Sequence, residues 1–180
     1  MGYNLAIERL EGMFMQKGYT MKIAMYGMLI SLAFIFSYIE SLIPFFMGVP
    51  GMKLGLANIV VLIALYLMGP KAAFLLSIVR VLLASMTFGN MIMLWFSIAG
   101  ASFAFVAMLF LKKMKGFSIV GVSIAGAVAH NIGQIIVAMI VMTEVMIYYL
   151  FVLIVGGTIT GTIIGFIGAL VYKKLKPVFH

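Results

Sequence analysis

The stretch GVSIAGAVAHNIGQIIVAMIVM, residues 121–142, decides the fold class of this chain. It is long enough to cross the hydrocarbon core of a bilayer as a helix, which takes about 20 residues, and it contains no Lys, Arg, Asp or Glu. Its large polar side chains are His130, Asn131 and Gln134. Because such groups are costly in hydrocarbon, their presence in a membrane helix calls for a physical explanation.

The composition extends this interpretation to the whole chain. Of its 180 residues, 66% are hydrophobic and 9% are charged, values typical of an integral membrane protein. We predict an all-α, polytopic protein in which a cytoplasmic or interfacial leader, residues 1–20, precedes a transmembrane domain of residues 21–176. The six predicted spans are about 22–44, 54–69, 72–88, 91–111, 118–142 and 147–172.

The basic residues predict the orientation of these spans. All Lys and Arg residues except Lys53 and Arg80 fall on one side of the six-span arrangement. Because Lys and Arg in short loops remain in the cytoplasm, we expect both termini to be cytoplasmic and Lys53 to lie outside. The same distribution accounts for the net charge of +8 and argues against nucleic-acid binding.

Polar residues within the spans concentrate in the predicted outer half of the bundle. His130 and Asn131 lie four and three residues before Gln134, so the three share one side of a helix. Counting 1.5 Å per residue puts Arg80 and Gln134 both roughly 12 Å below the outer boundary. We predict that Arg80, His130, Asn131 and Gln134 line a substrate pocket open to the outside. Four further residues would lie nearer its mouth: Glu40, Lys53, Asn58 and Asn90. The alternative is that these groups only hydrogen-bond neighbouring helices.

Two further features concern access and partners. Residues 44–58, PFFMGVPGMKLGLAN, contain two prolines and three glycines and cannot be regular helix throughout. We expect this apolar loop to fold over the outer mouth as a lid. In the first span, Gly27, Ser31 and Ala33 belong to a pattern of small residues that lets a partner helix approach closely.

Two stretches, IPFFMGVPGMKLGLANIVVLIALYLMG and GVSIAGAVAHNIGQIIVA, resemble the bacterial Gx transporter family, whose members often carry the label heptaprenyl diphosphate synthase component I. The resemblance covers roughly residues 20–175. In size and number of spans the family is more distantly similar to the S components of energy-coupling-factor vitamin transporters. It implies a six-helix protein of the bacterial cell membrane that binds a small molecule from outside, with an energising membrane subunit and its ATPases as expected partners. By the same resemblance, Gly27, Ser31 and Ala33 would contact that partner.

The synthase label is at odds with the residues present. Prenyl chain elongation needs carboxylate clusters that hold magnesium against a diphosphate, whereas this sequence contains no aspartate. We therefore predict no prenyl diphosphate synthase activity for the chain alone, no metal site and no cofactor. A phosphate-binding glycine loop is also absent from the sequence, so ATP hydrolysis would come from a partner.

Three functions remain open at this point. The first is a substrate-binding or transport subunit for a small polar or anionic organic molecule, vitamin-like or flavin-like. The second is an accessory membrane subunit of a quinone or flavin electron-transfer system, or of a prenyl-quinone system. The third is a structural membrane anchor, in which the polar stripe only joins helices.

Overall fold

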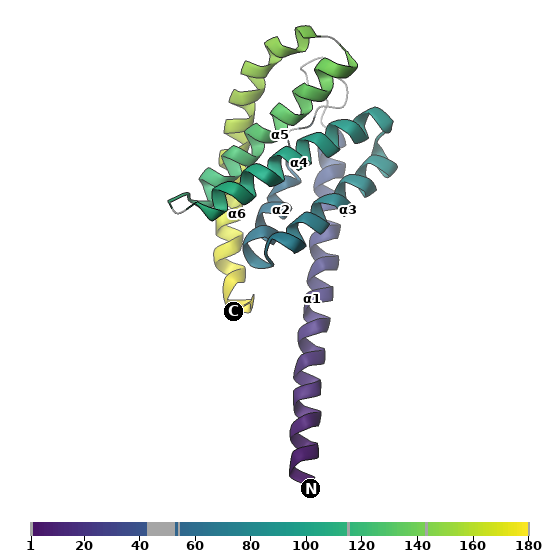
Figure 1. Cartoon of the computed structure of the whole chain (residues 1–180), viewed down its shortest axis with the longest axis vertical. Helices are drawn as coiled ribbons and strands as arrows, with labels where there is room; N and C mark the ends of the chain where they lie inside the picture. Colours follow the sequence, from purple (N-terminus) through teal and green to yellow (C-terminus); the bar gives the residue numbers. More distant parts are fainter. Residues whose placement is uncertain (1, 43–52, 54, 115, 143, 180) are drawn as a thin grey trace.

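The computed structural model describes residues 2–42, 53, 55–114, 116–142 and 144–179. Over these residues the chain is a bundle of six α-helices and one short 3₁₀ helix (Figure 1). Their order is α1 (Gly2–Leu42), α2 (Asn58–Leu67), α3 (Pro70–Phe88), α4 (Met91–Lys113), α5 (Ile119–Val141), η1 (Glu144–Tyr149) and α6 (Leu150–Phe179).

Five of these helices, α1, α3, α4, α5 and α6, contain apolar stretches long enough to cross a membrane. Large hydrophobic side chains are exposed on their outer faces, for example Ile35 on α1, Phe74 on α3 and Phe166 on α6. Such a surface suits contact with lipid chains rather than water. The prediction of an all-α, multi-pass membrane protein is confirmed.

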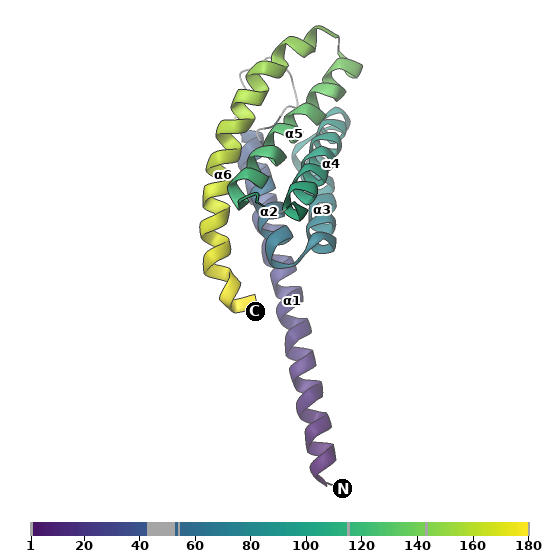
Figure 2. The same cartoon turned by 60° about the vertical axis from the view of Figure 1, so that its left-hand side comes forward.

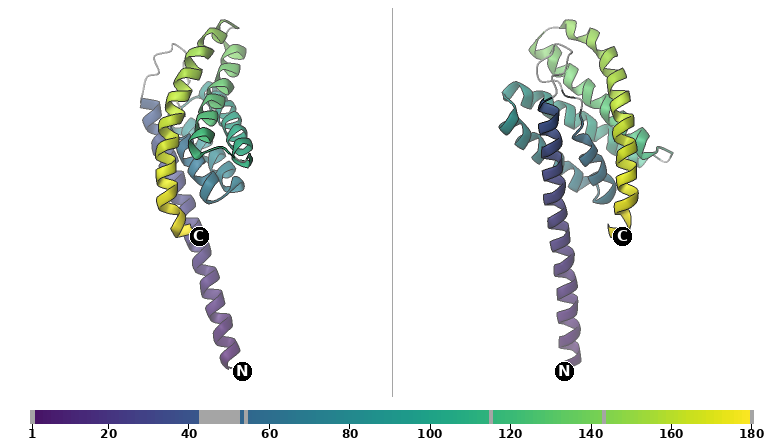
Figure 3. Two further views of the ribbon diagram at one scale, coloured as in Figure 1. Left: turned by 90° about the vertical axis from the view of Figure 1, so that its left-hand side faces the viewer. Right: turned by 180° about the vertical axis from the view of Figure 1, so that it is seen from behind.

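The short helix α2 forms the centre of the bundle. It has 10 residues, and all of them except Tyr66 are buried. Every other α-helix contacts it. Helix α6 lies to its left in Figure 2, and the view from behind places α2 between α1 and α6 (Figure 3, right). At 1.5 Å per residue it covers about 15 Å, half the thickness of the hydrocarbon core. It is shorter than the predicted span of 54–69 because Gly55, with a φ of 81°, begins a turn that continues to Ala57.

Helix α1 continues through residue 20 without interruption, so the predicted leader is part of the same helix. Its N-terminal part extends well beyond the rest of the bundle (Figure 1). Both termini lie toward the same end of the molecule (Figure 1). That arrangement agrees with the expectation that they share one side of the membrane.

Glycine allows α5 to pack closely on both α4 and α6. A methyl group added at Gly133 of α5 would lie 2.7 Å from the carbonyl oxygen of Ala99 in α4. A methyl group added at Gly161 of α6 would lie 2.7 Å from the Cα of Ile124 in α5. Since both contacts are with backbone, larger residues would force the helices apart. These two crossings position the polar side chains of α5 against their neighbours.

Candidate functional site

Polar side chains from five helices gather in the interior around the start of α2. We call this group the polar core. Each member is at most 6% exposed. The members are Glu40 (α1), Asn58 (α2), Arg80 (α3), Ser97 (α4), His130 and Gln134 (α5).

The end of the loop before α2 is bonded to the polar core. We call its described residues, Lys53, Gly55 and Leu56, the loop end. The backbone N–H groups of Gly55 and Leu56 both donate to Oε1 of Glu40. The backbone N–H of Lys53 donates to Oε1 of Gln134 at 3.3 Å. The loop end therefore joins α1 to α5.

The Lys53 side chain also points toward the polar core. Its Nζ donates to Oγ of Ser97 at 3.4 Å. Burial lowers the pKa of the Lys53 amine below its ordinary value of 10.5, and the nearby charge of Glu40 acts in the opposite direction. Ser97 was not predicted from the sequence, because a lone serine in a membrane helix carries no signal beyond its depth. The predicted lid otherwise lies mostly outside the described residues, since only the loop end and the residues after it belong to them.

Arg80 is the most unusual member of the polar core. It is 5% exposed, and its only hydrogen bond among the described residues is a long one, 3.4 Å from Nη2 to Oδ1 of Asn58. Its Nε and the Nδ2 of Asn58 have no partner in that part of the chain. Nor does any described carboxylate approach the guanidinium closely enough to form an ion pair, although the charge of Glu40 acts on it. Burying an arginine with so few partners is costly unless an anion is bound.

The His130 ring fills the space between two glycines. A methyl group added at Gly100 of α4 would lie 2.7 to 3.0 Å from three atoms of the ring, and one added at Gly55 would lie 3.4 Å from its Cδ2. The Gly100 backbone approaches the ring, yet neither ring nitrogen completes a hydrogen bond within the described structure. The Nε2 of Gln134, one turn further along α5, is equally without a described partner.

Two predicted pocket residues lie apart from the polar core. Asn131 is turned toward α6, where its Nδ2 donates to the carbonyl oxygen of Leu153 at 2.7 Å. Asn90 is exposed and caps the start of α4, where its Oδ1 accepts from the N–H of Met93 at 2.9 Å. The structure thus brings Glu40, Lys53, Asn58, Arg80, His130 and Gln134 together but not these two.

The predicted partner-binding residues on α1 differ in exposure. Gly27 and Ser31 are exposed, one turn apart, and a methyl group added at Gly27 would meet no atom within 4 Å. Ala33, in contrast, is fully buried in the core beside α2. Only Gly27 and Ser31 therefore lie on an accessible side of α1.

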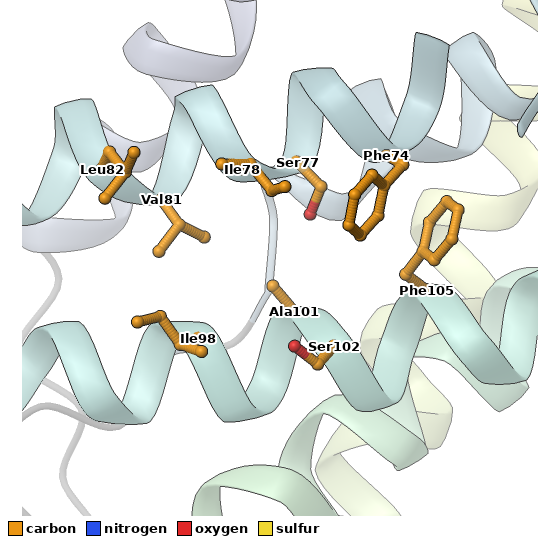
Figure 4. Close-up of a pocket in the computed structure, with 9 residues that line it drawn as sticks. All are labelled: Phe74, Ser77, Ile78, Val81, Leu82, Ile98, Ala101, Ser102 and Phe105. Carbon is orange, nitrogen blue, oxygen red and sulfur yellow. The ribbon is translucent and has the colours of Figure 1, made fainter. Parts of the chain in front are cut away.

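A separate groove of about 290 Å³ lies between α3 and α4, whose side chains face each other across it (Figure 4). It contains none of the residues predicted from the sequence, and its lining is largely apolar: Phe74, Ser77, Ile78, Val81, Leu82, Ile98, Ala101, Ser102 and Phe105. Several of these side chains are among the exposed hydrophobic residues of α3 and α4. The groove suits lipid hydrocarbon and does not provide the polar contacts of the polar core.

The fold and the polar core define a multi-pass, all-helical membrane protein whose interior contains polar groups without partners among the described residues. Residues 29–171 match the family described as heptaprenyl diphosphate synthase component I, and the chain belongs to that family, which is the Gx transporter family identified above. No curated protein and no solved structure shows significant similarity to the chain. The family's description names component I of a synthase and does not itself name a catalytic subunit.

Proposed function

We propose that this protein is a substrate-binding or transport subunit of the bacterial cell membrane. It captures a small polar or anionic organic molecule, vitamin-like or flavin-like, from the outer side, and a separate partner supplies the energy. The observation that supports this proposal best is Arg80, a buried cation with one long hydrogen bond and no ion pair among the described residues. A bound anion or carbonyl group would supply what the guanidinium lacks.

The surroundings of Arg80 support capture better than they support a purely structural role. Residues that only join helices would be expected to bond to each other, as Asn131 does to Leu153. In the polar core, by contrast, Gln134 bonds to the loop end and His130 has no described hydrogen-bond partner. Groups left open beneath a loop are what a ligand site requires.

Release of the loop end would give the molecule a way in. The backbone of the loop end is held by two side chains: Glu40 accepts from two of its N–H groups and Gln134 accepts from one. A ligand that bonds to Gln134 would compete for the oxygen that Lys53 now uses. Binding and loop movement would then be coupled.

We also propose that the chain alone has no prenyl diphosphate synthase activity. The sequence has no aspartate, and its four acidic residues include no intramembrane pair that could hold magnesium against a diphosphate. Among the described residues, no group of three His, Cys, Asp or Glu side chains is placed to bind a metal.

The test is to purify the protein in lipid nanodiscs, extract its small molecules and identify them by mass spectrometry. Arg80→Ala should lose the bound compound, because it removes the uncompensated cation. Lys71→Ala is the matched control: it removes an exposed positive charge from the same helix and should retain the compound. Unchanged ligand content in Arg80→Ala would contradict the proposed role of Arg80, and an empty wild-type protein that no compound stabilises would contradict ligand capture itself.

A further inference from the structure

We propose that the ligand of the polar core is a small organic molecule with a single carboxylate, which binds between Arg80, Asn58, His130 and Gln134. This inference rests on the proposed function and narrows it to one chemical class. It depends on two independent observations, the balance of charge and the kind of hydrogen-bonding groups left open.

The charge balance favours an anion with one charge. Arg80 and Lys53 provide two positive charges, and the only described carboxylate on which both act is that of Glu40. Glu40 is already engaged, because its Oε1 accepts from two backbone N–H groups of the loop end. One positive charge is left over. A monoanion would neutralise it, whereas a dianion such as a phosphate monoester would replace it with a buried negative charge of equal cost.

The open hydrogen-bonding groups favour a carboxylate among the monoanions. Arg80 Nε, Asn58 Nδ2 and Gln134 Nε2 are donors without described partners. A neutral imidazole carries one N–H, so His130 adds a fourth donor. The two oxygens of a carboxylate accept about four hydrogen bonds in total. The two amide nitrogens each carry two N–H groups, so the four donor atoms offer six N–H groups in all, and one carboxylate can accept one hydrogen bond from each atom.

The geometry places these donors close enough to share one group. Arg80 and Asn58 are hydrogen-bonded to each other, and Asn58 Nδ2 and the His130 ring both lie against Gly55. Gln134 lies one turn from His130 on the same side of α5 and bonds to Lys53, two residues before Gly55. A primary amide would fit this arrangement less well, because its NH₂ group would meet mainly donors, with the unprotonated nitrogen of His130 as the one acceptor among these open groups.

The experiment has two measurements on the full-length protein in nanodiscs. The extracted compound is treated to form methyl esters and should gain one methyl group. In parallel, the ligand-free protein is melted with acetate, acetamide or methyl phosphate at constant ionic strength. Acetate should raise the melting temperature, and the other two should not. Acetate is used because it is the smallest probe that carries the proposed group without constraints from the rest of a ligand.

Two variants separate binding from folding. Arg80→Gln should weaken the response to acetate by about tenfold to a hundredfold, the usual effect of losing a charge-assisted hydrogen bond. Without ligand it should be at least as stable as the wild type, because it removes an uncompensated buried cation. If Arg80→Gln does not fold, Lys53→Gln replaces it. That change lies outside the membrane helices and should reduce the preference for acetate over acetamide.

Each outcome decides the matter. An extracted compound that gains no methyl group, or two, overturns the carboxylate but leaves ligand capture intact. Equal stabilisation by acetate and acetamide also overturns the carboxylate and leaves ligand capture intact. A full acetate response in the variant tested has the same consequence. If the wild type yields no compound and none of the three probes stabilises it, the proposed function and this inference fail together.

Discussion

The contact between Gly100 and His130 allows a sharp test of how α4 and α5 form the polar core. In Gly100→Ala, the new methyl carbon would lie 2.7 Å from Cε1, 2.8 Å from Nδ1 and 3.0 Å from Nε2 of the ring. Ordinary contacts begin at 3.4 Å, so the ring or the helix has to give way by about 0.7 Å. Overpacking of this kind costs about 1–3 kcal/mol.

The same change should be harmless once the ring is gone, because all three close atoms belong to His130. We therefore predict that Gly100→Ala lowers the unfolding free energy by about 1–3 kcal/mol in the wild type but not in a His130→Ala background. Gly156→Ala is the control for the higher helix propensity of alanine, since a methyl group there meets no atom within 4 Å.

The assay is reversible unfolding in mixed micelles with increasing denaturing detergent, carried out on the two single variants, the double variant and the control. A coupling energy near zero between Gly100 and His130 would refute the reasoning, because it would mean that the ring does not lie against α4. A change in stability equal to that of Gly156→Ala would have the same meaning.

Three further predictions concern other parts of the molecule. Gly161→Ala should have a lower melting temperature than Gly156→Ala in the same helix, because its methyl group would lie 2.7 Å from the backbone of α5. Equal melting temperatures would show that α5 and α6 are farther apart than this contact requires. Asn131→Leu should lower stability by about 0.5–1.5 kcal/mol, because it removes a buried hydrogen bond between α5 and α6. It should leave ligand content unchanged, and loss of ligand would place Asn131 in the site. Burial lowers the pKa of Lys53 in the folded protein, so the unfolded chain holds that proton more tightly. The ligand-free wild type should therefore gain stability as pH rises from this lowered pKa toward 10.5. In melting experiments across that pH range, Lys53→Met should lack this gain.

The sequence was sufficient to predict the class of fold, because the bilayer imposes long apolar helices on any chain of this composition. It did not predict the central place of α2. The apolar run 54–69 was predicted as one of six spans, whereas α2 begins only at Asn58 and is enclosed by all the other α-helices. Burial on every side and a lipid-facing span both require an apolar sequence, so composition alone does not distinguish them.

For the site, the sequence identified residues that meet but not the direction of every side chain. Arg80 and Gln134 were predicted at the same depth and Asn58 nearer the mouth, and all three belong to the polar core. Asn131, three residues before Gln134, was predicted to lie on the same polar stripe, but the Asn131 amide faces α6. Successive residues of a helix point about 100° apart, and the rotation of α5 is set by glycine contacts that no periodicity in α5 alone reveals.

The two uses of intramembrane polarity can be compared within one turn of α5. Asn131 donates to Leu153 across a crossing at which Gly157 leaves room for the amide, since a methyl group there would lie 2.8 Å from its Nδ2. This bond joins two helices, although the Oδ1 of Asn131 has no partner among the described residues. Gln134 accepts only from the loop end, and its own donor is open among the described residues.

The cost of an open group decides between the two interpretations. An unpaired neutral amide costs about 1–3 kcal/mol, which a stable bundle tolerates, but a buried guanidinium with one long hydrogen bond costs considerably more. A role in joining helices would be served better by a neutral residue at position 80, so the buried charge favours the proposed bound anion. Arg80, more than the stripe of α5, is therefore the residue on which the proposed function rests.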